Sequence, residues 1–318
     1  MTTDSAISLT GASSNARIRL VDSTRLGRFY HGSAESFFAG RDSKRYRRQI
    51  QLILTSPPFP LNRKKKYGNY QGEDYIAWLA GFAPLFRRVL APNGSIVIEM
   101  GNSWEKGHPV MSTLATRALL RFMEAGKFYL CEQFVSYNSA RLPSPAQWVN
   151  VERIRVKDAF THVWWMSPSP RPKADNTKVL RAYSASMQKL IASQTYNYGV
   201  RPSEHRIGKK SFLKDNGGSI PSNVLEFPNT ASRDQYLDYC KDHHLRPHPA
   251  RMPAGLAQFF IEFLTDPKDR VLDPFAGSNT TGVVAERLGR KWASVELKRD
   301  YVDGARSRLH NLPDSPRG

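Results

Sequence analysis

Two short apolar segments of this chain each end abruptly in a loop rich in proline or glycine. The first, residues 50–54, stops at Thr-Ser-Pro-Pro-Phe, and the second, residues 271–273, continues into Pro-Phe-Ala-Gly-Ser-Asn-Thr-Thr. A short apolar run that ends in this way is typical of a strand buried in a parallel sheet. In open parallel sheets ligands bind beyond the carboxyl ends of the strands, where the strand order reverses. We therefore expect the two loops to form the two sides of one crevice.

The segments between these strands alternate in type, which predicts an α/β fold. Apolar residues recur every three or four positions across residues 75–89, with acidic residues before them and arginines at their end, as in an amphipathic helix. Pro84 lies inside this pattern and predicts a kink or a break. The remaining elements are predicted as strands at 95–100, 127–137, 160–167 and 292–296, and as helices at 110–125, 256–264 and 301–309.

The texture of the chain changes twice along its 318 residues. We expect residues 1–26 and 311–318 to be flexible tails, because both are polar and lack periodicity. Residues 27–167 and 246–310 carry the α/β pattern. Residues 168–245 are rich in Pro, Ser, Asn, Gly and basic side chains, and they are interpreted as an inserted region, either functional or simply solvated.

The charge of the chain points to a negatively charged partner. Lys and Arg number 47 against 28 Asp and Glu, a formal net charge of +19. Such an excess favours association with a polyanion, most simply a nucleic acid. The sequence shows no apolar run that could span a bilayer and no secretory signal, so we expect a soluble, cytoplasmic protein without a membrane partner. The only cysteines, Cys131 and Cys240, predict neither a disulfide framework nor a metal site.

The loop after the second strand has the features of a cofactor cradle. Gly277 permits a close backbone approach, and Thr280 or Thr281 can cap the helix that follows. Asp273 could hold an ammonium group, and Glu296, which ends the next strand, could accept hydrogen bonds from ribose hydroxyls. The glycine patterns of dinucleotide sites and ATP P-loops are absent from the sequence. The alternative is an ordinary strand-to-helix turn.

The loop after the first strand presents hydrogen-bond acceptors. Pro57 and Pro58 lack backbone N–H groups, so the carbonyls there are held rigidly and face no competing donor from these two residues. Ser56 adds a hydroxyl and Phe59 an aromatic plane. Fixed acceptors beside an aromatic plane suit an exocyclic amino group on a flat heterocycle. The alternative is a strand-terminating turn with a phenylalanine in the core.

Together these segments resemble the S-adenosylmethionine-dependent DNA methyltransferases that methylate an exocyclic amine. The Ser-Pro-Pro-Phe form is typical of the cytosine-N4 enzymes, and the amine motif precedes the cofactor motif, as in the circularly permuted beta class. The resemblance covers most of residues 27–309, including His248–Pro253. It departs at Asn279, where the family often has Gly, and at Ser33, where Asp is common. Asn tolerates left-handed backbone angles, so the loop can keep its form.

The resemblance implies a Rossmann-like, mostly parallel sheet with helices on both faces, and a target recognition region at 168–245. It implies a methyl transfer to the N4 amine of a cytosine flipped out of double-stranded DNA, and it suggests a cognate restriction endonuclease as a partner. The implied catalytic residues are Ser56, Pro57, Pro58 and Phe59. The implied S-adenosylmethionine-binding residues are Gly32, Thr55, His248, Pro249, Asp273, Pro274, Phe275, Ala276, Gly277, Ser278, Asn279, Thr280 and Glu296. The expected DNA-binding residues are Arg63, Lys64, Lys65, Lys66, Arg201, Arg206, Lys209 and Lys210.

Several alternatives stay open at this stage. The same machinery could methylate adenine N6, although Asp-Pro-Pro-Tyr would be the stronger adenine signal. A non-catalytic DNA-binding relative and an RNA or small-molecule methyltransferase are further readings. Cytosine-C5 chemistry is disfavoured, because neither cysteine follows a proline as that family's nucleophile does. Trp148, Trp164 and Trp165 could line a base pocket, but burial in the core is the better expectation.

Overall fold

The computed structural model describes residues 17–59, 70–209, 212–227 and 235–310. The residues up to Ala174, together with those from Asn223 onward, form one compact unit, and Asp175–Ser222 form a second. No helix in these described ranges combines the length and the hydropathy needed to cross a bilayer.

A single mixed sheet organises the larger unit. Its strands, among the described residues, lie in the order β1-β2-β11-β10-β3-β4-β6-β5-β9. The block from β2 to β4 is parallel, while β1 and β6 run antiparallel to their neighbours. The strands are β1 (Arg19–Ser23), β2 (Gly27–His31), β3 (Ile50–Thr55), β4 (Leu90–Gly101), β5 (Tyr129–Tyr137), β6 (Phe160–Ser167), β9 (Val224–Glu226), β10 (Arg270–Asp273) and β11 (Lys291–Glu296).

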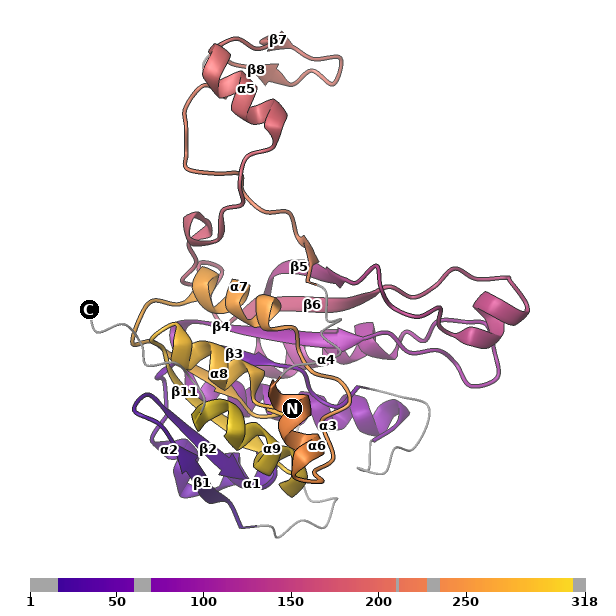
Figure 1. The fold of residues 1–318 in the computed structure, drawn as a ribbon, viewed down its shortest axis with the longest axis vertical. Helices are drawn as coiled ribbons and strands as arrows, with labels where there is room; N and C mark the ends of the chain where they lie inside the picture. The colour runs from indigo at the N-terminus through magenta and orange to yellow at the C-terminus, as the bar shows by residue number, and fades with distance from the viewer. Residues whose placement is uncertain (1–16, 60–69, 210–211, 228–234, 311–318) are drawn as a thin grey trace, which may run out of the picture. The chain divides into compact units, whose positions relative to one another are not determined.

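Helices cover both faces of this sheet (Figure 1). The buried cluster on one face takes its side chains from α1, α3 and α4, and α7 and α8 pack together on the other. The helices are α1 (Ala34–Ala39), α2 (Arg41–Lys44), α3 (Gly72–Val89), α4 (Leu114–Gly126), α6 (Gln235–Asp242), α7 (Ala254–Leu264), α8 (Thr280–Arg287) and α9 (Arg299–His310).

Two neighbouring tryptophans on β6 show how the alternation of a strand serves both layers. The Trp164 side chain belongs to the core cluster beneath α3 and α4, whereas the Trp165 ring contacts Phe263 of α7 at 5.2 Å between ring centroids. Both are buried, which confirms the expectation of core positions for this pair. Trp148 lies outside the core, in a loop segment, and pairs with Trp104.

The strand order reverses between β3 and β10. From β10 the chain continues through α8 to β11 on one side, and from β3 it continues through α3 to β4 on the other. β3 and β10 are direct parallel neighbours, with Leu52 opposite Val271 and Ile53 opposite Leu272. The two strands singled out in the sequence therefore flank the switch point of the sheet, as expected.

Three local expectations differ from the structure. Helix α3 continues through Pro84 without a break, because apolar residues on both sides of the proline, such as Leu79 and Phe86, anchor the helix in the core. The expected N-terminal tail contains β1, which pairs with β2 and adds an edge to the sheet. The weakly periodic residues 223–245 belong to the larger unit, because β9 pairs with β5 and α6 contacts α9.

The second unit contains a short hairpin and one helix. The hairpin joins β7 (Gly199–Val200) to β8 (Arg206–Ile207), and the helix is α5 (Ala185–Ser193), preceded by a 3₁₀ turn at Asn176–Val179. It is also basic, since residues 175–222 hold eight Lys or Arg against three Asp or Glu.

Candidate functional site

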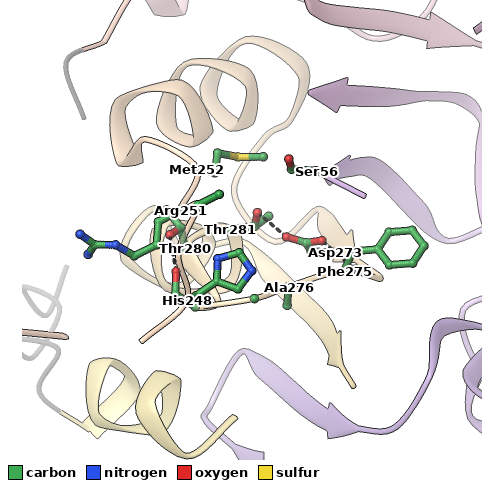
Figure 2. Close-up of a pocket in the computed structure, with 12 residues that line it drawn as sticks. Ser56, His248, Arg251, Met252, Asp273, Phe275, Ala276, Thr280 and Thr281 are labelled. Atoms are coloured by element: carbon green, nitrogen blue, oxygen red, sulfur yellow. Dashed lines mark hydrogen bonds between the residues drawn. The ribbon is translucent and has the colours of Figure 1, made fainter. Parts of the chain in front are cut away.

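The ends of β3 and β10 open onto a cavity at the switch point. Ser56, which follows β3, lines the cavity together with Asp273, which ends β10 (Figure 2). The space enclosed is about 300 Å³, part of it open to solvent. The sequence-predicted residues that line it are Ser56, His248, Asp273, Phe275, Ala276, Gly277, Ser278 and Thr280. The chain thus brings the two motifs to one cavity.

Asp273 is the buried acidic group of this cavity. Its carboxylate accepts hydrogen bonds from the Thr55 hydroxyl (2.6 Å), the Thr281 hydroxyl (2.7 Å) and the Phe275 backbone N–H (3.1 Å). Burial outweighs these bonds and raises the pKa of Asp273 to about 6. The predicted cofactor contact of Thr55 takes a different form here: Thr55 is fully buried and supports Asp273 from behind rather than lining the cavity.

The loop after β10 is shaped by two left-handed residues. Gly277 has φ +53° and Asn279 has φ 55°, so asparagine adopts the conformation that its sequence position requires. A Cβ on Gly277 would lie 3.0 Å from the His248 ring, so that ring packs directly on the loop. Figure 2 shows the His248 ring beside this loop. The predicted close approach at Gly277 is therefore made by a side chain of the protein itself.

Glu296 ties the loop to the neighbouring strand. Its carboxylate accepts hydrogen bonds from the Gly277 N–H (2.8 Å) and the Lys298 N–H (2.7 Å), and burial raises its pKa to about 7. Gly32 lies next to it, since the Gly32 N–H donates to the Glu296 carbonyl at 3.0 Å. Neither residue lines the cavity described above, and neither do Pro274, Asn279 or Pro249.

Phe59 packs at the end of β4, beside the first motif. A Cβ on Gly101 would approach the Phe59 ring to 2.6 Å, so the ring rests on a glycine that leaves it room. Phe59 is half-buried against the core, which leaves part of the ring available. Pro57 is buried and Pro58 half-buried, and neither lines the cavity.

Glu99 is a site residue that the sequence reading missed. It lies near the end of β4, where its buried carboxylate accepts a 3.0 Å hydrogen bond from Thr161 and a further one from Ser56. Burial raises the pKa of Glu99, and these hydrogen bonds and the charge of Arg141 lower it in part. An acidic residue within the apolar run Ile-Val-Ile-Glu-Met was the available signal, because such a strand rarely buries a charge without a use.

The segment 248–252 closes another side of the cavity. The His248 N–H donates to the Tyr236 hydroxyl at 2.8 Å, and the His248 ring meets the Tyr301 ring edge-on at 4.7 Å. Arg251 and Arg308 lie over the Tyr236 ring, at 5.4 and 5.7 Å from its centroid. Ala250, Arg251, Met252 and Thr281 also line the cavity and were not among the predicted contacts.

Arg308 supports the cofactor loop from outside. Its guanidinium donates to the Ser278 carbonyl (3.0 Å) and to the Thr280 hydroxyl (3.1 Å). These bonds hold the start of α8 against α9. The sequence reading missed this residue because its partner lies in a different element, 30 positions away.

The predicted DNA-binding residues fall into two groups. Arg201, Arg206 and Lys209 are exposed on or beside the hairpin of the second unit, where the Lys209 ammonium lies 5.4 Å from the Tyr198 ring centroid. Arg63, Lys64, Lys65, Lys66 and Lys210 lie outside the described residues.

Neither cysteine belongs to the cavity. Cys240 is fully buried beside Tyr236, and burial raises the pKa of the Cys131 thiol to about 11. A thiol with a raised pKa is a poor nucleophile at neutral pH. The site therefore relies on oxygen and nitrogen groups.

Comparison with known proteins agrees with this geometry. Residues 50–307 match the family described as DNA methylase, which includes the N6 and N4 enzymes. The Type II methyltransferase M.PvuII of Proteus hauseri is 50% identical over 255 residues, which are 80% of this chain and 76% of that protein. A solved structure titled as the cytosine-N4-specific PvuII DNA methyltransferase aligns with a TM-score of 0.72 at 39% identity, over 93% of this chain and 89% of that one.

A more distant solved structure shares the fold. It is a DNA modification methylase of Thermus thermophilus complexed with S-adenosyl-L-methionine, with a TM-score of 0.53 at 19% identity over 92% of this chain and 96% of that one. The family match spans most of the chain, including both strand-end motifs and the cavity between them. The chain belongs to the DNA methylase family.

Proposed function

We propose that this protein transfers a methyl group from S-adenosylmethionine to the N4 amine of cytosine in double-stranded DNA. The observation that carries the proposal is the common cavity of Ser56 and Asp273, which brings a wall of hydrogen-bond acceptors opposite an acidic wall. The likeness to M.PvuII and to the cytosine-N4-specific structure supports N4 of cytosine as the target.

The acidic wall fits the cofactor chemically. Asp273 is buried and its pKa is raised to about 6, so a cationic ligand next to it would favour the ionised carboxylate. Asp273, Gly277 and Thr280 would hold the methionine end, and Phe275 offers an apolar surface in the same cavity. Bound there, S-adenosylmethionine supplies a methyl carbon whose bond to the sulfonium sulfur breaks as the bond to nitrogen forms.

Ser56 would orient the amine. The hydrogen bond between Ser56 and the Glu99 carboxylate commits the hydroxyl hydrogen, which leaves the Ser56 oxygen lone pairs for an N4 hydrogen. Accepting that hydrogen turns the nitrogen lone pair away from the ring plane and towards the methyl donor. Most of the rate enhancement would then come from positioning and fixed dipoles.

Glu99 would also receive the proton that the methylated amine loses. A carboxylate with a raised pKa binds a proton more readily than an exposed one, and Ser56 connects it to the amine. In this role Glu99 accepts the proton through the Ser56 hydroxyl, which passes on its own hydrogen as it gains one. The charge on the product amine is thereby removed within the site.

The target base must leave the duplex before it reaches this cavity, at a cost of a few kcal/mol for unstacking. The exposed part of the Phe59 ring would stack on the flipped cytosine. The basic unit at 175–222 would read the DNA sequence, and Arg201, Arg206 and Lys209 would contact DNA from there. We also propose a cytoplasmic location and a cognate restriction endonuclease, as is typical of Type II methyltransferases.

Nucleoside analysis tests the proposal. Purified protein is incubated with unmethylated plasmid and methyl-labelled S-adenosylmethionine, and the digested nucleosides are separated by mass spectrometry. The proposal predicts label in N4-methylcytosine. Label in N6-methyladenine would move the activity to the adenine alternative, and no label in any nucleoside would favour a non-catalytic relative.

A further inference from the structure

The connection between β5 and β6, residues 138–159, forms an arm beside the active site. β5 and β4 both pair antiparallel with β6, so they run in the same direction and end at the same edge of the sheet. β3, which ends at Ser56, is parallel to β4. The arm therefore leaves the sheet at the edge that carries the methyl-transfer site, and Figure 1 shows it extending well beyond the strands.

Specific contacts give the arm a defined shape. The Arg155 side chain donates to the Pro109 carbonyl (3.0 Å), and the Asn102 amide donates to Asp158 (2.9 Å). The rings of Trp104 and Trp148 lie 5.4 Å apart between centroids. These contacts fasten the arm to the loop that follows β4, so the arm projects as a built element.

The end of the arm exposes apolar and basic side chains in alternation. All residues of Val151–Lys157, here named the arm tip, are exposed. Val156 is 87% exposed and Val151 69%, more than nearly all large apolar side chains among the described residues. Neighbouring Leu142 is 84% exposed. Apolar side chains gathered on a protruding surface mark a contact site.

The charges of the arm select the partner. Residues 138–159 contain four Lys or Arg and two Asp or Glu. The acids are engaged locally, since Glu152 accepts from Gln147 (3.0 Å) and Asp158 from Asn102. Arg153 makes no side-chain contact with any described residue and is exposed. A cationic tip fits a polyanion, and it disfavours a second copy of a chain whose net charge is +19.

We propose that the arm tip docks on the DNA duplex next to the flipped base. Arg153 and Lys157 contact phosphates, and Ile154 and Val156 press against the base step that the departing cytosine leaves open. Apolar wedges flanked by cations are an established means of holding an unstacked step. This inference rests on the proposed function, because it takes DNA as the substrate of the same site.

Salt dependence of DNA binding tests the cations. The probe is a short fluorescein-labelled duplex carrying the sequence that the wild-type protein methylates. The double variant Arg153→Gln/Lys157→Gln should bind with a slope of log K against log salt about 2 units shallower, since each lost phosphate contact removes about 0.9. The matched control is Arg47→Gln/Arg48→Gln, which removes two exposed charges before β3, at the opposite edge of the sheet, and should keep the wild-type slope.

A mispaired substrate tests the apolar wedge. Ile154→Ser/Val156→Ser should methylate the paired duplex about tenfold more slowly, a loss of ~1.4 kcal/mol. It should approach the wild-type rate when the target cytosine is mispaired, because a mispaired base costs less to extrude. Leu120→Ser, at an exposed apolar position on α4, should act as wild type on both substrates.

The outcomes separate this inference from the proposed function. If the wild-type protein methylates cytosine and both arm variants match their controls, the arm inference is wrong and the function stands. If the wild-type protein transfers no methyl group to DNA, the proposed function itself fails. A wild-type dimer that Ile154→Ser/Val156→Ser converts to a monomer in sedimentation would assign the arm tip to self-association and overturn the inference.

Discussion

The Thr55 hydroxyl donates a 2.6 Å hydrogen bond to the Asp273 carboxylate, which joins residues 218 positions apart in the chain. Thr55 ends β3 and Asp273 ends β10, so this bond crosses the switch point of the sheet. Through it, the amine-binding motif that begins at Ser56 is fixed relative to the acidic wall of the cavity.

Removing this bond should weaken both stability and cofactor binding. Thr55→Val keeps the side-chain volume but leaves a buried carboxylate with one donor fewer, at a cost of about 1–3 kcal/mol. Urea unfolding should report that loss, and calorimetry should show weaker S-adenosylmethionine binding. Thr116→Val, at an exposed position in α4, should change neither. Unchanged unfolding in Thr55→Val would show that the bond contributes nothing.

Ser56 and Phe59 should act on the transfer step rather than on cofactor binding. The double variant Ser56→Ala/Phe59→Ala should lose methyl transfer by at least about a hundredfold, since positioned groups commonly contribute that much or more. Its affinity for S-adenosylmethionine, measured by calorimetry, should stay within a few fold of wild type. Full activity in this double variant would defeat the proposed role of the motif.

Glu99 should be separable into a hydrogen-bond role and a proton role. Glu99→Gln can still accept hydrogen bonds from Ser56 and Thr161 but does not take up a proton at neutral pH. We expect its rate to fall about tenfold or more, while its unfolding free energy changes little. Single-turnover rates across pH check this. A rate equal to wild type at every pH would exclude Glu99 as the proton acceptor.

The unliganded protein should lose stability as pH rises from acidic values towards neutrality. Asp273 and Glu296 have folded-state pKa values of about 6 and about 7, above their ordinary values, so the folded state holds their protons more tightly than the unfolded state does. The stability from Asp273, on the order of 3 kcal/mol, is full below pH ~4 and lost by pH ~6. Glu296 extends the window to pH ~7.

Urea unfolding at several pH values measures this dependence, and Asp273→Asn is the control. That variant cannot ionise at the position, so its stability should fall less steeply between pH ~4 and ~6. Stability that rises through the window in the unliganded wild-type protein would mean that both carboxylates are ionised more easily in the folded state. The same measurement with cofactor present should show a smaller decline, because a cation favours ionised Asp273.

Asn279 should tolerate glycine better than alanine. Its backbone is left-handed, a conformation that glycine adopts freely and alanine does not. Its amide is fully buried and finds no partner among the described residues. Asn279→Gly should therefore be more stable than Asn279→Ala by about 1 kcal/mol. Thermal unfolding compares the two, and equal stability would contradict the argument from the backbone.

The sequence predicted those parts of the fold that a local pattern encodes. The apolar runs before Thr55 and at Val271–Asp273 marked buried strands, and their loops marked the switch point, because period and turn residues are local properties. Asn279 in a left-handed conformation was likewise expected from its residue type and position.

Other features depend on partners that no local pattern reveals. The strand β9 is three residues long and exists because β5 offers it a free edge. Glu99 is a site residue only because β4 pairs with β3 and β6, which bring Ser56 and Thr161 to its carboxylate. The sequence of Val151–Lys157 likewise does not indicate that this segment projects beside the site.

The position of the bound cofactor tests the central claim most directly. A crystal structure with S-adenosylhomocysteine, the product of the transfer, measures the distance from its sulfur to Ser56 and to Asp273. We predict that the ligand lies in the cavity between the two residues, with its amino group near Asp273 and its sulfur facing Ser56. Ligand density elsewhere, with this cavity left to water, would contradict the account.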